Sequence, residues 1–105
     1  MIDSNIQAAL DILVPAMQPE EIYLYGSRAR GDAGEYSDYD FFVVMPDNAP
    51  TDKIDLFYTH DLMRALPITV EVIPCRKFYF DRNKSLLGTL GYNVVREGKR
   101  IYARA

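Results

Sequence analysis

A glycine–serine turn and a pair of aspartates are the residues of this sequence that could carry chemistry. Gly26-Ser27 follows an apolar stretch, and Asp38-Tyr39-Asp40 comes after ten intervening residues. A glycine lets the backbone approach a phosphate closely, and a serine hydroxyl with the free N–H groups of a following turn can bind phosphate oxygens. Two carboxylates can hold a divalent metal ion such as Mg²⁺. Together these features indicate phosphoryl or nucleotidyl transfer.

Glu71 is a candidate third carboxylate for the same site. It stands between two valines in another apolar stretch, where a carboxylate is costly unless it is paired or binds metal. Asp38 and Asp40 project from one face of a strand because side chains alternate with a period of two. If the two strands are neighbours, the three acids surround one or two Mg²⁺ ions and are the catalytic and metal-binding set.

Two simpler interpretations of these acids stay open. Asp38 belongs to a solvated loop in one of them, so that only Asp40 enters the strand. In the other, Glu71 faces solvent from a half-exposed edge strand. The sequence does not decide between these interpretations and the metal site.

Arg28 and Arg30 flank the phosphate turn. They could neutralise triphosphate charge or stabilise a leaving pyrophosphate. They could equally form structural ion pairs, for example with Asp32 or Glu35.

Aromatic and histidine side chains near these residues are weaker candidates. Tyr25, Tyr36 and Tyr39 could stack on a nucleobase, although aromatic residues beside strands more often pack in a core. His60 stands beside Asp61 in an expected helix, so we expect it to be solvated.

Alternating helices and strands are expected to position this site. Helical spacing of apolar residues, caps and proline stops predicts the helices, and short aromatic and β-branched runs predict the strands. The sequence predicts a helix from a capping box at Ser4 to Pro19, a strand over 21–25, a helical turn over 27–30, a strand over 38–45, a long helix from an N-cap at Thr51 to Pro67, a strand over 68–73 ended by Pro74, an ambiguous segment over 77–82, a helix over 86–97 stopped by Gly98, and a short edge strand over 101–102.

Length and charge limit the class of protein. With 105 residues and 49% hydrophobic residues, we expect one domain over residues 1–105, without a separate substrate module. The net charge of −3 disfavours a long nucleic acid as partner, because polynucleotide-binding surfaces are usually basic. Self-association stays open.

Cellular placement is predicted from what the sequence lacks. It has no apolar run of about 18 residues, and Asp3 and Asp11 stand where a signal peptide would be basic and then apolar. We therefore expect a cytoplasmic protein without membrane contact. Cys75, the single cysteine, is interpreted as a small buried side chain rather than a catalytic thiol.

The segment Gly26-Ser27 with Asp38 and Asp40, together with Ala29-Arg30-Gly31, resembles the nucleotidyltransferases of the DNA polymerase beta superfamily, specifically the minimal nucleotidyltransferases. The resemblance runs from the first helix to Glu71. It implies an α/β (α+β) fold with a small mixed sheet flanked by helices. It also implies Ser27 as a phosphate contact, Asp38 and Asp40 as metal ligands, and Glu71 at a position where the family commonly has Asp.

The resemblance also implies a partner. Minimal nucleotidyltransferases often act as antitoxins of a helical HEPN-type ribonuclease toxin, and some are similar to enzymes that transfer AMP from ATP to that toxin. On this basis we expect Mg²⁺-dependent transfer of a nucleoside monophosphate to a partner protein. The alternative is a non-catalytic antitoxin that masks its toxin by binding. Transfer to a small molecule such as an aminoglycoside is disfavoured, because it usually needs a larger acceptor-binding region.

Overall fold

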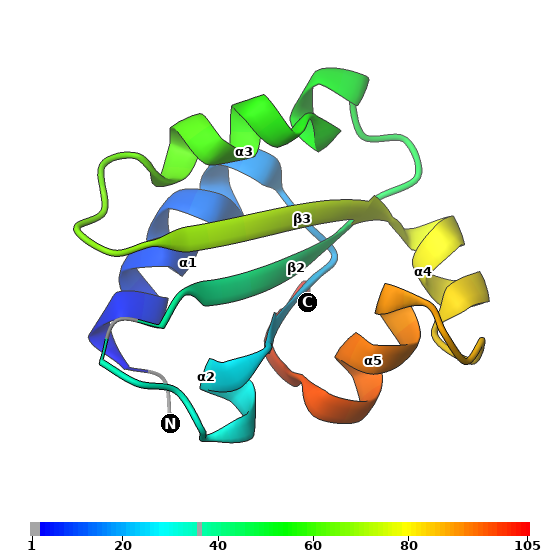
Figure 1. Cartoon of the computed structure of the whole chain (residues 1–105). Helices are drawn as coiled ribbons and strands as arrows, with labels where there is room; N and C mark the ends of the chain where they lie inside the picture. The colour runs from blue at the N-terminus through cyan, green and yellow to red at the C-terminus, as the bar shows by residue number, and fades with distance from the viewer. Residues whose placement is uncertain (1–2, 36) are drawn as a thin grey trace.

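Four strands form one mixed sheet with helices on both faces in the computed structural model, which describes residues 3–35 and 37–105. The strands are β1 (Glu21–Tyr25), β2 (Tyr39–Met45), β3 (Val70–Arg76) and β4 (Lys99–Ala103), and the helices are α1 (Ser4–Met17), α2 (Ser27–Arg30), the 3₁₀ turn η1 (Thr51–Ile54), α3 (Leu56–Met63), α4 (Lys77–Asn83) and α5 (Leu90–Glu97). Figure 1 shows α1 and α3 beside one face of the sheet and α4 and α5 beside the other. The expected α/β fold is confirmed.

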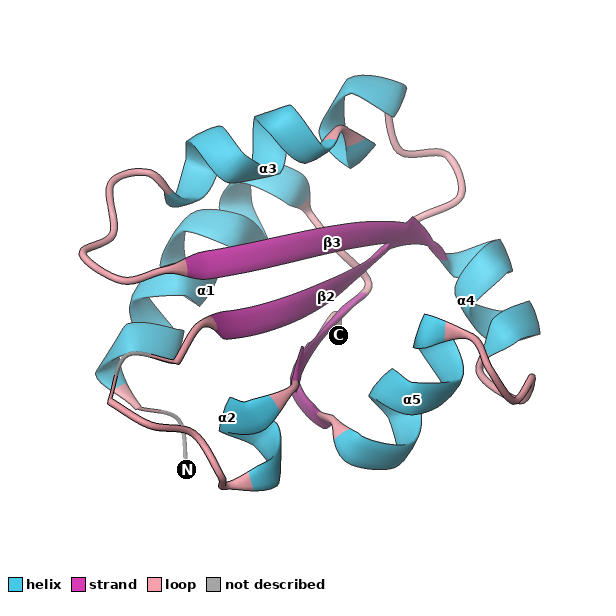
Figure 2. Cartoon of the chain, in the orientation of Figure 1, coloured by secondary structure: helices cyan, strands magenta, loops and turns pink. Residues whose placement is uncertain are grey.

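The strand order β3-β2-β1-β4 places the sequence motif at the centre of the sheet. β1 pairs antiparallel with β2 and with β4, whereas β2 pairs parallel with β3 through the crossover that contains α3 (Figure 2). In this register Asp40 stands opposite Glu71 on one side and opposite Tyr25 on the other. The parallel crossover therefore brings two acids together that are 31 positions apart in the sequence.

β2 is covered on both faces, as its apolar composition predicts. Its odd-numbered side chains, among them Phe41, pack with α1 and α3 into the larger core. Its even-numbered side chains Phe42 and Val44 form a smaller core with Phe80 of α4 and Val94 of α5. Because Asp40 shares the even-numbered face, its carboxylate lies at the rim of the smaller core.

The caps of two helices differ from the sequence prediction. Asp3, not Ser4, caps α1, because its Oδ1 accepts a hydrogen bond of 2.7 Å from the N–H of Ile6. The long helix predicted from Thr51 is interrupted at Asp55, which caps α3 by accepting from the N–H of Phe57 at 2.7 Å. An aspartate four residues into the segment can restart a helix because its carboxylate competes for the N–H groups that would continue the first one.

The prediction that Pro74 ends the third strand is wrong. β3 continues to Arg76 and lies at the edge of the sheet, where the proline is tolerated because its missing N–H faces away from β2. The Thr59 hydroxyl of α3 donates to the carbonyl of Val72 at 3.4 Å. Pro74 and the contact from Thr59 thus reduce the number of backbone groups that this edge offers to another strand.

The last helix is shorter than predicted. α5 begins at Leu90 with Thr89 as its N-cap, so Leu86 and Leu87 lie in the preceding turn. The ambiguous segment over 77–82 is helical as α4, and β4 confirms the expected strand after Gly98. None of the helices within the described residues is long and apolar enough to cross a membrane.

Candidate functional site

Gly26 joins β1 to α2 and lies directly against Asp40. Its φ is +73°, a conformation that side-chain-bearing residues rarely adopt. A Cβ added at Gly26 would collide with the Asp40 carboxylate. The glycine therefore allows both the sharp turn into α2 and the close approach of an acid to that turn.

The acids gather on the face of the sheet that carries the smaller core. Asp40 and Glu71 are register partners on β2 and β3, so their side chains share this face. Asp40 is half-buried, whereas Glu71 is exposed. Asp38 lies one residue before β2 and is exposed. The prediction that the strand begins at Asp38, with Asp38 and Asp40 on one strand face, is therefore wrong, and the alternative that places Asp38 in a loop is correct. Glu71 is exposed on an edge strand, as its simpler interpretation predicts.

Asp40 is surrounded by groups that change its affinity for a proton. Burial raises the pKa of Asp40, and the charges of Glu71 and Asp38 raise it further, while Arg30 acts in the opposite direction. Burial and the charges of Glu71 and Asp40 together raise the pKa of the Tyr25 hydroxyl to about 12. The site thus carries an excess of negative charge that a divalent cation would neutralise.

The donor set fits magnesium in its chemistry. All the candidate ligand atoms are carboxylate oxygens, which Mg²⁺ prefers, and this ion usually takes only one or two of them together with water and phosphate. Within residues 3–35 and 37–105, no group of three or more His, Cys, Asp or Glu side chains is arranged so that it could hold a metal ion. Asp38, Asp40 and Glu71 therefore do not form a three-carboxylate metal site in this structure, and their role as metal ligands stays a prediction.

The two arginines have different environments. Arg28 donates to the carbonyl oxygen of Ser37 at 2.9 Å and lies 4.2 Å from the ring centroid of Tyr39, so it holds the loop that leads into β2. Arg30 pairs with Asp32 at 3.3 Å and approaches Glu97 of α5 at 4.0 Å. Arg30, which also acts on Asp40, is the arginine better placed to meet a phosphate.

The tyrosines near the motif also differ from one another in their environments. Tyr39 is only 3% exposed, and its hydroxyl donates to Asp3 at 3.2 Å and accepts from Asn5 at 3.2 Å, so it is a packing residue and not a base-stacking one. Tyr25 lies on the acidic face. Tyr36 is outside the described residues.

Two further predictions concern residues outside the acidic cluster. His60 is exposed, as expected. Cys75 is partly buried beside the smaller core, and burial raises the pKa of its thiol. A thiol held protonated is a poor nucleophile, which agrees with a packing role.

The structure contains a cavity two strand positions beyond Asp40 and Glu71 that was not predicted from the sequence. It has a volume of about 210 Å³ and lies between β3, α4 and α5. Its walls include Phe42 and Ile73, which follow Asp40 and Glu71 by two positions on the same face. The alternating apolar residues of these strands were the only signal, and they predict burial rather than a cavity.

Comparison with known proteins bears directly on this site. The family model of the nucleotidyltransferase domain matches residues 6–90, a range that includes Gly26, Ser27 and the three acids. No curated protein matches the chain.

Three solved structures share the fold. A toxin–antitoxin structure with AMP-PNP is 23% identical with a TM-score of 0.63, over 93% of this chain and 73% of that one. A mutant of the toxin–antitoxin MntA–HpeT, in which two aspartates two positions apart are changed to glutamate, is 21% identical with a TM-score of 0.61, over 99% of this chain and 75% of that one. A candidate nucleotidyltransferase from Sulfolobus solfataricus is 21% identical with a TM-score of 0.55, over 99% and 91%.

Proposed function

Because the chain belongs to the nucleotidyltransferase domain family, we propose that it transfers a nucleoside monophosphate, AMP from ATP, to a hydroxyl group of a partner protein. The observation that supports this most directly is the register that sets Asp40 opposite Glu71 beside the Gly26 turn. A phosphate cradle and paired acids at one place are what in-line nucleotidyl transfer requires.

Each residue of the site has a role in this proposal. Gly26 and Ser27 bind the triphosphate through the start of α2, and Arg30 offsets its charge. Asp38, Asp40 and Glu71 are the ligands of one or two Mg²⁺ ions. When bound, Mg²⁺ neutralises phosphate charge and lowers the pKa of the attacking hydroxyl.

Glu71 lies on β3, an edge strand of the sheet, and is exposed. An acceptor that approaches from solvent therefore meets Glu71 before it meets Asp40. We assign Glu71 to the acceptor side of the site, where its carboxylate can also accept the proton of the hydroxyl. Arg28 supports the loop before Asp38 rather than the nucleotide itself.

We further propose that the acceptor is a HEPN-type toxin and that the protein is its antitoxin, acting in the cytoplasm. Two of the structures with this fold are toxin–antitoxin assemblies, and one of these contains a nucleotide analogue. The aspartates changed in the MntA–HpeT mutant have the spacing of Asp38 and Asp40.

A non-catalytic antitoxin is the second candidate function. The exposure of Glu71 favours it, and so does the finding that no three acidic, histidine or cysteine side chains among the described residues are arranged to hold a metal ion, because both weaken metal binding in the absence of nucleotide. Such a protein would mask its toxin by contact alone.

The deciding experiment uses the purified protein, Mg²⁺, each nucleoside triphosphate in turn and the protein encoded by the adjacent reading frame. Intact mass spectrometry is expected to show one added nucleoside monophosphate on the partner, and none with EDTA or with the double variant Asp38→Asn/Asp40→Asn. A partner whose mass stays unchanged with every nucleotide, yet whose toxicity is still suppressed, would support the masking function instead.

A further inference from the structure

The turn between α4 and α5 presents leucine side chains to solvent. Leu86, Leu87 and Leu90 are 48%, 84% and 39% exposed, and we refer to them as the hairpin patch. The turn is held in place, because the Thr89 hydroxyl donates to the carbonyl of Asn83 at 2.8 Å and the Leu86 N–H donates to the same carbonyl at 2.8 Å. The leucines are thus exposed by a defined backbone and not by a loose loop.

The hairpin patch borders the cavity beside the acids. Leu90 and Gly91 line this cavity together with Phe80, and Phe42 and Ile73 form its floor. Two residues of strand span roughly 7 Å, so the cavity lies about that far along the sheet from Asp40 and Glu71. An occupant of the cavity would therefore lie next to the site of transfer.

The size and chemistry of the cavity favour a single side chain. Its volume of about 210 Å³ is below the roughly 300–1,000 Å³ of pockets that enclose small-molecule ligands. Aromatic and aliphatic side chains make up most of its wall. An apolar anchor inserted into such a pocket, surrounded by a ring of weaker contacts, is the usual centre of a protein–protein interface.

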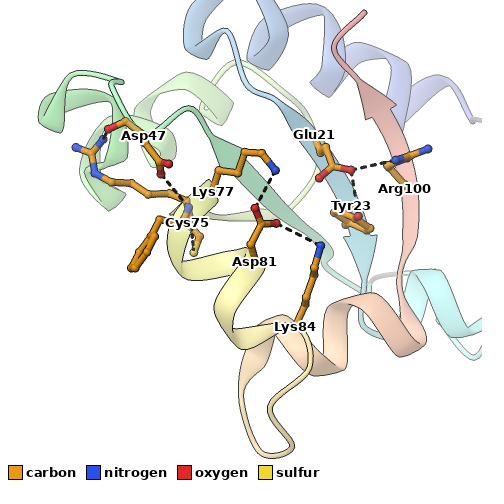
Figure 3. A network of polar contacts seen from close by, with 10 residues as sticks. Glu21, Tyr23, Asp47, Cys75, Lys77, Asp81, Lys84 and Arg100 are labelled. Atoms are coloured by element: carbon orange, nitrogen blue, oxygen red, sulfur yellow. Dashed lines mark hydrogen bonds and ion pairs between the residues drawn. The ribbon is translucent and has the colours of Figure 1, made fainter.

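Charge around the patch favours an acidic partner surface. Residues 77–97 contain four basic and two acidic side chains, in a chain whose net charge is −3. Asp81 is engaged by Lys77 at 2.9 Å and by Lys84 at 3.3 Å, as Figure 3 shows. The excess of basic over acidic side chains on α4 and α5 disfavours a second copy docked here about a twofold axis, because it would bring segments of like net charge together.

We propose that the hairpin patch and its cavity are the docking surface for the acceptor protein, which inserts an apolar side chain ringed by acidic groups. This inference rests on the proposed function and deepens it, because docking at this place sets the acceptor protein on the same face of the sheet as Asp40 and Glu71. It assigns substrate recognition to α4 and α5 and nucleotide binding to the Gly26 turn.

Leu87→Glu and Phe57→Glu form the matched test. Phe57 is 82% exposed on α3, outside the hairpin patch, so both changes place the same charge at an equally exposed apolar position. Isothermal titration with the purified adjacent-frame protein is expected to show affinity reduced 10- to 100-fold by Leu87→Glu and changed less than twofold by Phe57→Glu. Leu87→Met is expected to retain affinity, and circular dichroism checks that each variant is folded.

A second measurement separates docking from nucleotide binding. Leu87→Glu and Leu90→Glu are expected to raise the KM for the acceptor protein, keep kcat at saturation and leave the Kd for Mg²⁺–AMP-PNP unchanged. Wild-type affinity of Leu87→Glu, or an equal loss from Phe57→Glu, would overturn the docking surface. Weaker AMP-PNP binding by Leu90→Glu would instead assign the cavity to the nucleobase. If the wild-type protein forms no complex with the adjacent-frame protein but still binds AMP-PNP, the docking surface is overturned and the nucleotide site is not. If the wild-type protein does not bind AMP-PNP, the proposed function itself is overturned.

Discussion

Replacing Asp40 by Asn is expected to stabilise the metal-free protein. Asp40 faces Glu71 across the β2–β3 pair and also senses Asp38. Burial raises the pKa of Asp40 in the folded state, and the charges of Glu71 and Asp38 raise it further, so the charged carboxylate disfavours folding. That penalty is fully present above the raised pKa and disappears as pH falls toward the ordinary value of 3.8. At pH 7 an uncharged amide of the same shape removes it.

The size of the effect follows from the geometry of the pair. A favourable pair directly opposite on neighbouring strands contributes roughly 0.2–1 kcal/mol, and like charges there destabilise the sheet; we take their cost to be of the same size, about 0.2–1 kcal/mol. For a domain of about 100 residues, this corresponds to a rise in Tm of about 1–8 °C. The matched control is Glu35→Gln, an exposed carboxylate in the loop before β2, which is expected to change stability by less than about 0.5 kcal/mol.

Thermal unfolding in EDTA, followed by circular dichroism at low and high salt, measures this effect. The gain from Asp40→Asn should shrink near 1 M salt, where the screening length is about 3 Å. Saturating Mg²⁺ should reverse the ranking, because only the wild type gains full binding energy. An Asp40→Asn variant that melts at or below the wild-type temperature in EDTA would refute the argument that these acids repel one another in the folded state.

Three further outcomes test the local structure. Gly26→Ala is expected to lower the free energy of unfolding in urea by about 1–3 kcal/mol and to abolish nucleotide binding, because Gly26 has a positive φ and its added Cβ would collide with the Asp40 carboxylate. The control Gly34→Ala should leave stability nearly unchanged, because its Cβ would meet only the Ser37 hydroxyl at 3.8 Å. Asp55→Ala is expected to lose about 0.5–2 kcal/mol as an N-cap, and a similar loss from Thr51→Ala would contradict the observed start of α3. Asp81 has its pKa lowered by hydrogen bonds from two lysines, so its contribution to stability is present above the ordinary value and is lost as pH falls through the lowered pKa; acid unfolding of Asp81→Asn should therefore depend less steeply on pH than that of the wild type.

Short-range patterns were enough to predict much of the fold. The strand over 21–25, the helical turn over 27–30 and the buried character of β2 are confirmed, because each depends on the composition of a few adjacent residues. The family could also be predicted from the sequence, because Gly26-Ser27 and the acid pair lie close together and have a specific spacing. The roles of Asp38, Asp40 and Glu71 in metal binding stay a prediction.

Competition between nearby signals limited what could be predicted. Thr51 and Asp55 are both good helix caps, and the sequence does not show that the carboxylate would begin α3. Leu86 and Leu87 have helical spacing with the residues of α5, yet Thr89 caps the helix after them. A proline usually ends a strand, but Pro74 is tolerated within β3 because its side of the backbone faces no partner strand.

The sequence by itself determined which residues could bind phosphate and metal, because that depends on side-chain chemistry and on spacing within a short segment. Only the tertiary structure decided which of them meet. The parallel pairing of β2 with β3 sets Asp40 beside Glu71, and the packing of Arg28 on Tyr39 leaves Arg30 as the arginine near the acids. Such contacts depend on a crossover and a register between distant segments, which no local pattern encodes.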